Sequence, residues 1–307
     1  MGCVKKVDTV NRFSVLLLIA GLLQAPSLLA APASLGVITF AEKPLRLIRT
    51  TVLYSASSGT RLQSGDLLES DQSITQIEGL ATSTVALGPN TRVAIDRSSG
   101  VTTLHVLQGW LKVQPAPGRT GDNLDINTRS LHLDVSRSAS VTHVSDNLVE
   151  VFVENGTQPL AELDKRGQAG RKTTLTHEQY SQRKGDEPLQ PAGRPPATFI
   201  SAMPNAFFDP LVLLSGKPAA NVQPKKIRDV DFEDIAHWLR APGLNRGALA
   251  TRFSPRLATP TFRKAIIREM GGSFEWETEL FRFESRGRAV KKTLSALPSY
   301  LPQSLGA

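Results

Sequence analysis

The sequence predicts a mainly β protein followed by a small α-helical region. Between residues 59 and 113, apolar side chains fall on alternate positions of short runs, and glycines interrupt these runs every 6 to 14 residues. Alternation is the period of a strand with one buried face, and breaks at this spacing are typical of sandwiches, barrels and solenoids. After residue 205 the apolar period becomes about 3.6 residues, which indicates amphipathic helices.

The N-terminus has the three parts of a secretory signal peptide. Lys5, Lys6 and Arg12 make up a basic region. Residues 13–23 form an apolar stretch, and residues 31–33 (Ala-Pro-Ala) match the small residues of a cleavage site. An uncleaved anchor is the alternative, but eleven apolar residues are too few for a bilayer that needs about 20. We expect export, removal of the signal peptide and no transmembrane helix in the mature chain.

The chain has a single cysteine, Cys3, which lies ahead of the apolar stretch. It is expected to leave with the signal peptide, so the mature chain would have no cysteine. This excludes disulfides, thiolate metal sites and cysteine nucleophiles. We therefore expect packing alone to stabilise the fold.

Two runs carry the clearest strand pattern, residues 83–95 and residues 104–113. Apolar and polar side chains alternate in both, so one face of each strand is expected in the core. The expected core residues are Val85, Leu87, Val93, Ile95, Leu104, Val106, Leu111 and Val113. Further strands are expected within residues 124–126, 131–135, 148–153, 172–176 and 179–183.

Turn residues separate these strands. Gly65 and Asp66 are expected to form one turn, in which the carboxylate accepts backbone N–H bonds rather than acting as a catalytic acid. A second turn is expected at Gly88 and Pro89. Gly109 lies within a run, where glycine marks a close approach of the backbone. We predict that a side chain at Gly65 or Gly109 would force unfavourable backbone angles or clashes.

These turns, together with the strand around Gly109, resemble the FecR-type domain of bacterial envelope proteins. The resemblance covers residues 36–183. It implies an all-β fold, a short β-solenoid or a sandwich, located in the periplasm. In signalling members of the family this domain receives a signal from an outer-membrane transporter, and a membrane helix joins it to a cytoplasmic sigma-binding segment. Neither of the last two parts is recognised in this sequence, so we expect contact with an envelope protein rather than a direct anti-sigma role.

The chain is expected to divide into four parts, which are a signal peptide (1–33), a FecR-like β domain (34–183), a proline-rich linker (184–204) and a basic helical region (205–307). The linker is assigned because residues 184–196 hold four prolines and two glycines without apolar periodicity. We expect limited proteolysis to begin there, because nothing in the pattern predicts that the stretch is held down.

Helix signals follow this linker. Apolar residues at i, i+3, i+4 and i+7 begin at Phe232, behind acidic cap candidates. Thr259 and Pro260 form an N-cap and first-turn pair for another helix. After Gly287 the sequence predicts loose order. The expected helices cover residues 232–239, about 244–253, and 260–270.

The helical region is also basic. Residues 195–307 carry 16 basic and 10 acidic residues, whereas residues 34–194 carry 17 of each. The candidates for contact with an anionic envelope protein or cell-wall polymer are Arg252, Arg256, Arg263 and Lys264. A solvated face with local ion pairs is the favoured alternative. Nucleic acid is not expected as a partner, because export removes the chain from it.

Trp110 has two open interpretations. A flat indole ring can pack on a sugar, which would make it a binding platform in an exported β domain. Its alternation with Leu111 and Val113 places it on the other face of the same strand. Packing within the fold is the favoured role there.

No catalytic, metal or cofactor site is expected. The five histidines are scattered without ligand spacing, and no nucleophile-elbow or phosphate-loop motif occurs. The predicted function is that of a periplasmic, non-enzymatic interaction or sensing protein. The alternative is an exported cell-wall or polysaccharide-binding protein or carbohydrate-active enzyme. Such a cleft needs paired carboxylates and aromatic platforms, and the whole chain has only 3 Trp, 3 Tyr and 12 Phe.

Overall fold

The computed structural model describes residue 2 and residues 33–81, 83–116, 123–214 and 221–296, with side chains up to residue 288. Residues 1 and 3–32, which hold nearly all of the predicted signal peptide including Cys3, lie outside the described residues. Ser34–Ala307 forms one compact unit. Among the described residues, no helix has the length and apolar character needed to cross a membrane.

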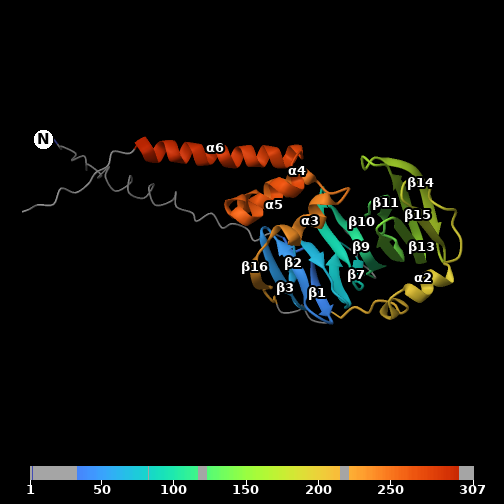
Figure 1. The fold of residues 1–307 in the computed structure, drawn as a ribbon. Helices are drawn as coiled ribbons and strands as arrows, with labels where there is room; N and C mark the ends of the chain where they lie inside the picture. The colour runs from blue at the N-terminus through green and yellow to red at the C-terminus, as the bar shows by residue number, and fades with distance from the viewer. Residues whose placement is uncertain (1, 3–32, 82, 117–122, 215–220, 297–307) are drawn as a thin grey trace, which may run out of the picture. The chain divides into compact units, whose positions relative to one another are not determined.

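The 16 described strands are hydrogen-bonded into one continuous sheet (Figure 1). Their pairings divide it into two parts, which we call sheet A and sheet B. Sheet A contains β1 (Gly36–Ala41), β4 (Arg61–Leu62), β6 (Thr75–Leu80), β7 (Ser83–Leu87), β12 (Ser138–Ser145) and β15 (Tyr180–Lys184). Sheet B contains β2 (Leu45–Arg49), β3 (Val52–Ala56), β5 (Leu67–Glu69), β8 (Arg92–Ser98), β10 (Asn123–Asn127), β11 (Leu131–Asp134), β14 (Ala169–Thr176) and β16 (Lys225–Asp229). Two longer strands, β9 (Val101–Pro115) and β13 (Leu148–Leu163), belong to both sheets.

The two shared strands join the sheets. The first half of β9 pairs with β8 and β10 in sheet B, and its second half pairs with β7 and β12 in sheet A. The first half of β13 pairs with β12 and β15, and its second half with β11 and β14. Gly109 and Gly156 lie at the two changeover points, with φ of 96° and 87°. Glycine reaches this region without a Cβ clash, so each strand can leave one sheet and enter the other.

A single apolar core fills the space between the sheets. Strand residues whose side chains point inward make up nearly all of it. All eight core residues that alternation predicts are buried there, which confirms the strand pattern of residues 83–95 and 104–113. The mainly β class with a helical C-terminal segment is likewise confirmed, and its sheets close in a barrel-like manner.

The described helices are α2 (Ala197–Ala202), η1 (Asn205–Phe207), α3 (Phe232–Arg240), α4 (Arg246–Phe253), η2 (Ser254–Ala258), α5 (Pro260–Met270) and α6 (Phe274–Ala296). The three predicted helices are confirmed as α3, α4 and α5, with Asp231 and Thr259 as the N-caps of α3 and α5. The prediction of loose order after Gly287 is wrong for residues 288–296, because α6 continues to Ala296, and residues 297–307 lie outside the described residues. A single glycine costs a helix only about 1 kcal/mol, so it need not end one.

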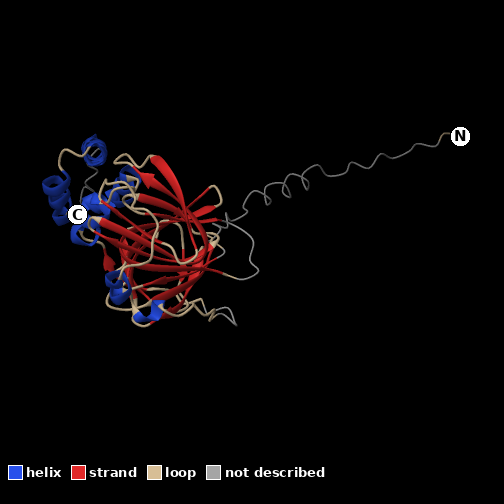
Figure 2. Cartoon of the chain, turned by 90° about the vertical axis from the view of Figure 1, so that its right-hand side faces the viewer, coloured by secondary structure: helices blue, strands red, loops and turns tan. Residues whose placement is uncertain are grey.

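The C-terminal helices cover the outer face of sheet B, and Figure 2 shows helices on the outside of the strands. Trp238 of α3, Phe253 of α4 and Phe262 of α5 are buried in a second apolar cluster. This cluster also contains Ile48 of β2 and Leu67 of β5, whose side chains point away from the first core. Burial on both faces explains why the early strands of sheet B lack a clean alternation.

The structure differs from the sequence prediction between residues 184 and 204. An exposed linker was expected there, but Leu189, Phe199 and Met203 are buried. Leu189 packs in the core between the sheets, whereas Phe199 and Met203 pack in a separate cluster with Trp110 and Tyr180, so no regular period marks these residues in the sequence. The region after residue 204 also contributes β16, which pairs with β3 in sheet B. Whether residues 34–183 can fold alone stays a prediction.

Candidate functional site

The candidate site lies on the outer face of sheet A, the face that points away from the core. Leu111 and Val113 of β9 point into the core, so Lys112 and Gln114 between and beyond them point outward. The pairing of β6, β7, β9 and β12 then aligns outward residues in rows across the sheet. One row contains Gln76, Ala86, Lys112 and Val141, and the next contains Glu78, Thr84 and Gln114.

Helix α2 covers one part of this face. Phe199 of α2 lies over Trp110 and Tyr180, with ring centroids 5.3 and 5.1 Å away, and over Phe152 at 6.3 Å. Trp110 is 8% exposed and stacks on His143 at 4.1 Å. The structure therefore gives Trp110 a packing role, and its ring is not available as a platform for sugar.

Residues 207–214, which we call the strap, continue from η1 across the same face. The ammonium group of Lys112 donates hydrogen bonds to the carbonyl oxygens of Phe207 (2.7 Å) and Asp209 (3.0 Å). Its third bond goes to the carboxylate of Glu154, at 2.7 Å. Lys112 is 1% exposed, so these three bonds satisfy a buried charge that would otherwise be costly.

Three more side chains bind the strap through its main chain. The amide of Gln114 accepts from the N–H of Leu211 at 2.7 Å and donates to the carbonyl of the same residue at 3.2 Å. Gln76 donates to the carbonyl of Val212 at 2.8 Å. The Glu78 carboxylate accepts from the N–H of Leu214, also at 2.8 Å. The strap is thus held by two strands, β6 and β9, at alternate outward positions.

Most side chains of the strap beyond Phe207 face solvent, whereas Leu211 is half-buried against the cluster of Trp110 and Phe207. Phe207 itself is fully buried, but the exposed fractions of Phe208, Val212, Leu213 and Leu214 are 51%, 67%, 48% and 52%. Large apolar side chains that lie together on a surface are uncommon in monomeric proteins unless they serve an interaction. The strap therefore presents a polar backbone to the sheet and apolar side chains to solvent.

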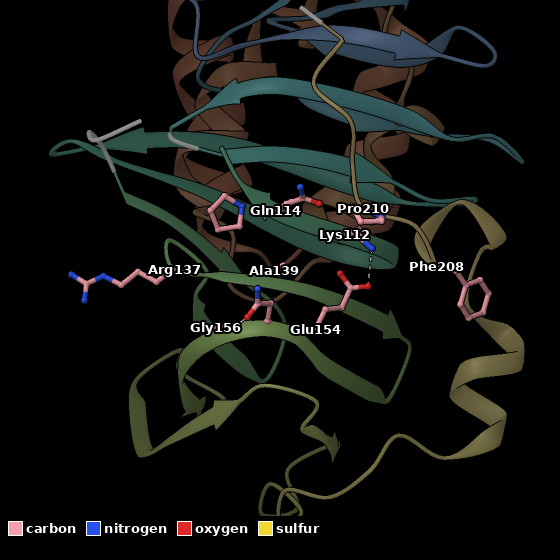
Figure 3. Close-up of a pocket in the computed structure, with 10 residues that line it drawn as sticks. Lys112, Gln114, Arg137, Ala139, Glu154, Gly156, Phe208 and Pro210 are labelled. Atoms are coloured by element: carbon pink, nitrogen blue, oxygen red, sulfur yellow. Dashed lines mark hydrogen bonds and ion pairs between the residues drawn. The ribbon is translucent and has the colours of Figure 1, made fainter. Parts of the chain in front are cut away.

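A groove of about 600 Å³ opens beside the strap (Figure 3). Its lining includes Lys112, Gln114, Ala139, Glu154, Phe208 and Pro210. Arg137 and Asn155 lie at its margin, and Figure 3 shows the Arg137 side chain extending away from the Lys112–Glu154 pair. Among the described residues, no carboxylate pairs with Arg137. The groove thus combines apolar walls with amide and guanidinium donors, which suits a peptide segment.

The groups of this face are arranged for binding rather than for proton transfer. Lys112 uses all three N–H bonds, so it has no free donor for a bound molecule and is not placed as a nucleophile. Nearby, His143 and Tyr180 hydrogen-bond the two carboxylate oxygens of Glu150, each at 2.7 Å. Burial raises the pKa of Glu150, but these hydrogen bonds lower it more, and the net shift is downward.

The sequence did not reveal this His143–Glu150–Tyr180 network. A usable signal is present only once the register is known, because His143 and Glu150 are direct cross-strand partners of β12 and β13. Spacing along the chain alone does not give that pairing.

The structure places the predicted turn residues away from the groove or behind it. Gly65 has a φ of 87°, and the neighbouring Asp66 carboxylate accepts from the N–H of Gln63 and from the guanidinium of Arg49. The Gly88 N–H donates to the carbonyl of Trp110 at 2.8 Å. A Cβ at Gly88 would lie 2.7 Å from the Cβ of Trp110.

Pro89 and Gly109 complete the predicted set. Thr91 fills the space beside Gly109, and its hydroxyl accepts from the Trp110 N–H at 3.0 Å and donates to the carbonyl of Gly88 at 2.9 Å. It also contacts the carbonyl of Pro89 at 3.3 Å. Thr91 thus connects the turn at Gly88 and Pro89 to the strand at Gly109 and Trp110.

The basic candidates of the helical region are not brought together on a free face. Arg252 donates to the carbonyls of Thr50 (2.8 Å), Ile48 (3.0 Å) and Gly65 (2.5 Å). Burial lowers the pKa of Arg252 to about 10. Its role in this structure is to join α4 to two turns of the β region.

Arg256 and Arg263 are also engaged within the fold. Arg256 bonds the carbonyl of Val230 and the carboxylate of Asp229, both at 3.0 Å. Arg263 bonds the carbonyl of Leu257 at 2.7 Å. Of the four candidates only Lys264 is exposed without a described partner.

A second pocket of about 470 Å³ lies between α3 and the turns of sheet B. Its lining includes Arg92, Arg240 and His237. Arg240 pairs with Glu269 at 2.8 Å, and His237 lies 2.5 Å from the buried carboxylate of Glu69. Burial raises the pKa of Glu69, but His237, Arg46 and Arg92 lower it more. These charges are largely neutralised by one another, so the groove beside the strap remains the stronger candidate.

Among the described residues, no group of His, Cys, Asp and Glu is placed to hold a metal ion.

Comparison with known proteins gives limited similarity. No family model matches the chain, and no curated protein matches it. Two crystal structures are partly similar, both described as a "putative anti-sigma factor from Parabacteroides distasonis ATCC 8503".

Each comparison has a TM-score of 0.35 and a sequence identity of 13%, and each covers 44% of this chain. The matched part is 63% of the first crystal structure's chain and 62% of the second's. The match therefore spans less than two thirds of those chains. Similarity at this level does not assign a family or an activity, and the FecR-type resemblance stays an expectation.

Proposed function

We propose that this protein is an exported, non-enzymatic interaction protein of the bacterial envelope that acts in the periplasm in a sensing or signalling assembly. The signal-peptide pattern and the FecR-type resemblance support the location and the class. The compact unit begins at Ser34, directly after the cleavage site expected from the sequence. We place the docking surface for its protein partner on the strap and the adjoining groove.

The observation that carries this proposal is the exposed apolar side of the strap. Four large apolar side chains of the strap face solvent, and one of them, Phe208, lines the groove of about 600 Å³. Water contact with such a cluster is unfavourable, and covering it by a partner would recover roughly 25 cal/mol for each Å² of apolar surface. A patch of this kind, rimmed by polar groups, is typical of protein–protein contact sites.

Polymer binding by the basic tail is the weaker candidate. The guanidinium groups of Arg252, Arg256 and Arg263 already bind carbonyls and carboxylates of the fold. The covered ring of Trp110 likewise gives no support to a sugar platform.

A site-specific crosslinking experiment tests the proposal. A photoreactive amino acid is placed at Leu213 or Leu214 of the full chain and activated in intact cells. Matched controls carry it at Ile227 and Ile267, which are both 53% exposed and lie on β16 and α5. We expect a discrete protein adduct from the strap positions and none from the controls.

A second variant shows whether the adduct reports docking. Phe208→Asp should reduce the adduct formed from Leu213 at least fivefold, because a charge would then enter the covered apolar surface. Equal labelling from all four positions, or labelling that ignores the Phe208 substitution, would overturn the proposal.

A further inference from the structure

The contacts between sheet A and the strap are nearly independent of the strap's sequence. Every hydrogen bond described from Gln76, Glu78, Lys112 and Gln114 to the strap goes to a main-chain N–H or carbonyl. Main-chain bonds supply affinity to any extended segment, whereas side-chain pockets supply specificity. The outer face of sheet A therefore has the chemistry of a binding site for an extended peptide, and the strap of the same chain occupies that site.

The strap is anchored at one end and lightly held along the rest. Phe207 is buried against Ala86 and Trp110, in the cluster that also holds Phe199. From Phe208 to Leu214 the chain forms no strand, and four of its large apolar side chains are exposed, while Leu211 is half-buried against that cluster. Segments with few buried apolar contacts open locally at a small fraction of the global stability. Residues 208–214 can thus leave the sheet while Phe207 stays in place.

The groove extends the same face beyond the strap. Ala139 of β12 and Asn155 of β13 are cross-strand partners, and both line the groove next to Gln114. The side-chain carbonyl oxygen of Asn155 accepts from the Gly156 N–H, and no described group bonds its amide N–H₂. An extended segment on Gln114 could therefore continue over these residues and gain contacts that the strap lacks.

We propose that the strap is a displaceable internal ligand, and that an extended, apolar segment of the partner protein replaces residues 208–214 on Gln76, Glu78 and Gln114. The inference rests on the proposed function and adds the mechanism by which the partner is held. The main chain of the partner then makes the bonds that the main chain of the strap makes here. The four exposed apolar side chains of the displaced strap can pack on the incoming segment.

The strap itself supplies a probe for this site. In the full chain, residues 208–214 are replaced by a Gly/Ser sequence of equal length. A fluorescent synthetic peptide with the sequence of residues 208–214, carrying lysines for solubility, is then titrated by anisotropy. We expect the strap-replaced protein to bind this peptide at least tenfold more tightly than the intact protein. A Gly/Ser segment keeps the main-chain groups, but it loses more conformational entropy when it lies extended on the sheet and lacks the Leu211 side chain, so it occupies the site less.

Substitutions test whether the sheet side chains make the site. In the strap-replaced protein, Gln114→Leu should raise the Kd at least fivefold, since it removes both bonds to the main chain of the position that Leu211 occupies. Gln168→Leu is the matched control, because Gln168 is exposed on the β13–β14 connection, and it should leave the Kd unchanged. Equal peptide affinity of intact and strap-replaced proteins, or insensitivity to Gln114→Leu, would overturn the inference.

Amide exchange in the intact protein provides a measurement that does not depend on the folding of the replaced variant. The N–H groups of Leu211 and Leu214 are bound to Gln114 and Glu78. Excess peptide should increase their exchange rates at least threefold and leave those of Val85 and Leu87 unchanged. Unaltered exchange at saturating peptide contradicts displacement. If crosslinks from Leu213 persist in that case, the partner docks on top of the strap, and only the displacement is lost.

Discussion

Gly65 and Gly109 both have a positive φ but differ in the space around them. A Cβ at Gly65 would meet no atom within 4 Å, whereas one at Gly109 would clash with Thr91. Gly65→Ala should therefore cost only the backbone term of about 1 to 2 kcal/mol. Gly109→Ala should cost clearly more, because Thr91 must move as well. Urea denaturation measures both, with Gly193→Ala as the control, since its Cβ would meet nothing and its φ is not positive. Equal costs at Gly65 and Gly109 would contradict the corner described for β9.

Arg252 is predicted to stabilise the fold rather than to bind a partner. Arg252→Ala leaves three carbonyl groups without their donor and should lower the free energy of unfolding by roughly 1.5 to 3 kcal/mol. Arg252→Lys should restore little, because an ammonium group cannot reproduce the planar fork. Lys264→Ala is the control and should change stability by less than about 0.5 kcal/mol. Comparable urea midpoints for the Arg252 and Lys264 variants would show that Arg252 does not stabilise the fold through these bonds.

The lowered pKa of Glu150 predicts a specific pH dependence. Because its pKa in the fold is below the ordinary value of 4.5, its contribution to stability is complete above that value and is lost as the pH falls through the lower pKa of the fold. Between about pH 5 and pH 3, the native protein should thus lose more stability than Glu150→Gln does. Urea denaturation across this range checks the difference. Parallel curves for the two proteins would show that Glu150 is not held as described.

At the scale of elements, α2 is predicted to hold the strap side of sheet A. Phe199→Ala removes a buried ring that contacts Trp110, Tyr180 and Phe152, and should cost roughly 3 to 5 kcal/mol. Thermolysin, which cuts before large apolar residues, should also cut faster before Ile200 in the loosened helix. Phe274→Ala is the control, because Phe274 is exposed on α6. Unchanged stability and cleavage in Phe199→Ala would mean that α2 is only loosely associated with the sheet.

Elements with a local signal were predictable from the sequence. The strands around Val85 and Leu111 alternate, and α3 and α5 begin at recognisable caps. The sequence does not predict β16, because all five of its residues are exposed and its pairing with β3 is set by a strand far away in the chain. Helix α2 is only six residues long, so tertiary contacts and not periodicity decide it.

At the scale of the whole molecule, the candidate site combines parts that no sequence window contains. Alternation places Lys112 and Gln114 on the outward face of β9, and that much was predictable. Their partners in the strap are 95 to 97 positions later in the chain, and those of Gln76 and Glu78 are 136 positions later. The role of Arg252 could not be predicted for the same reason, because its acceptors lie about 200 positions away.

The late position of β16 sets the order in which the chain can complete its sheets. β3 is at the border of sheet B until Lys226 reaches Tyr54, about 170 residues further along the chain. Until this later segment is in place, that border stays open. An open strand border can pair with another copy, whereas the finished border is a short strand rich in lysine and arginine. A nascent or truncated chain that ends before Lys225 is therefore the form most exposed to self-association, and a holding chaperone would act in that interval.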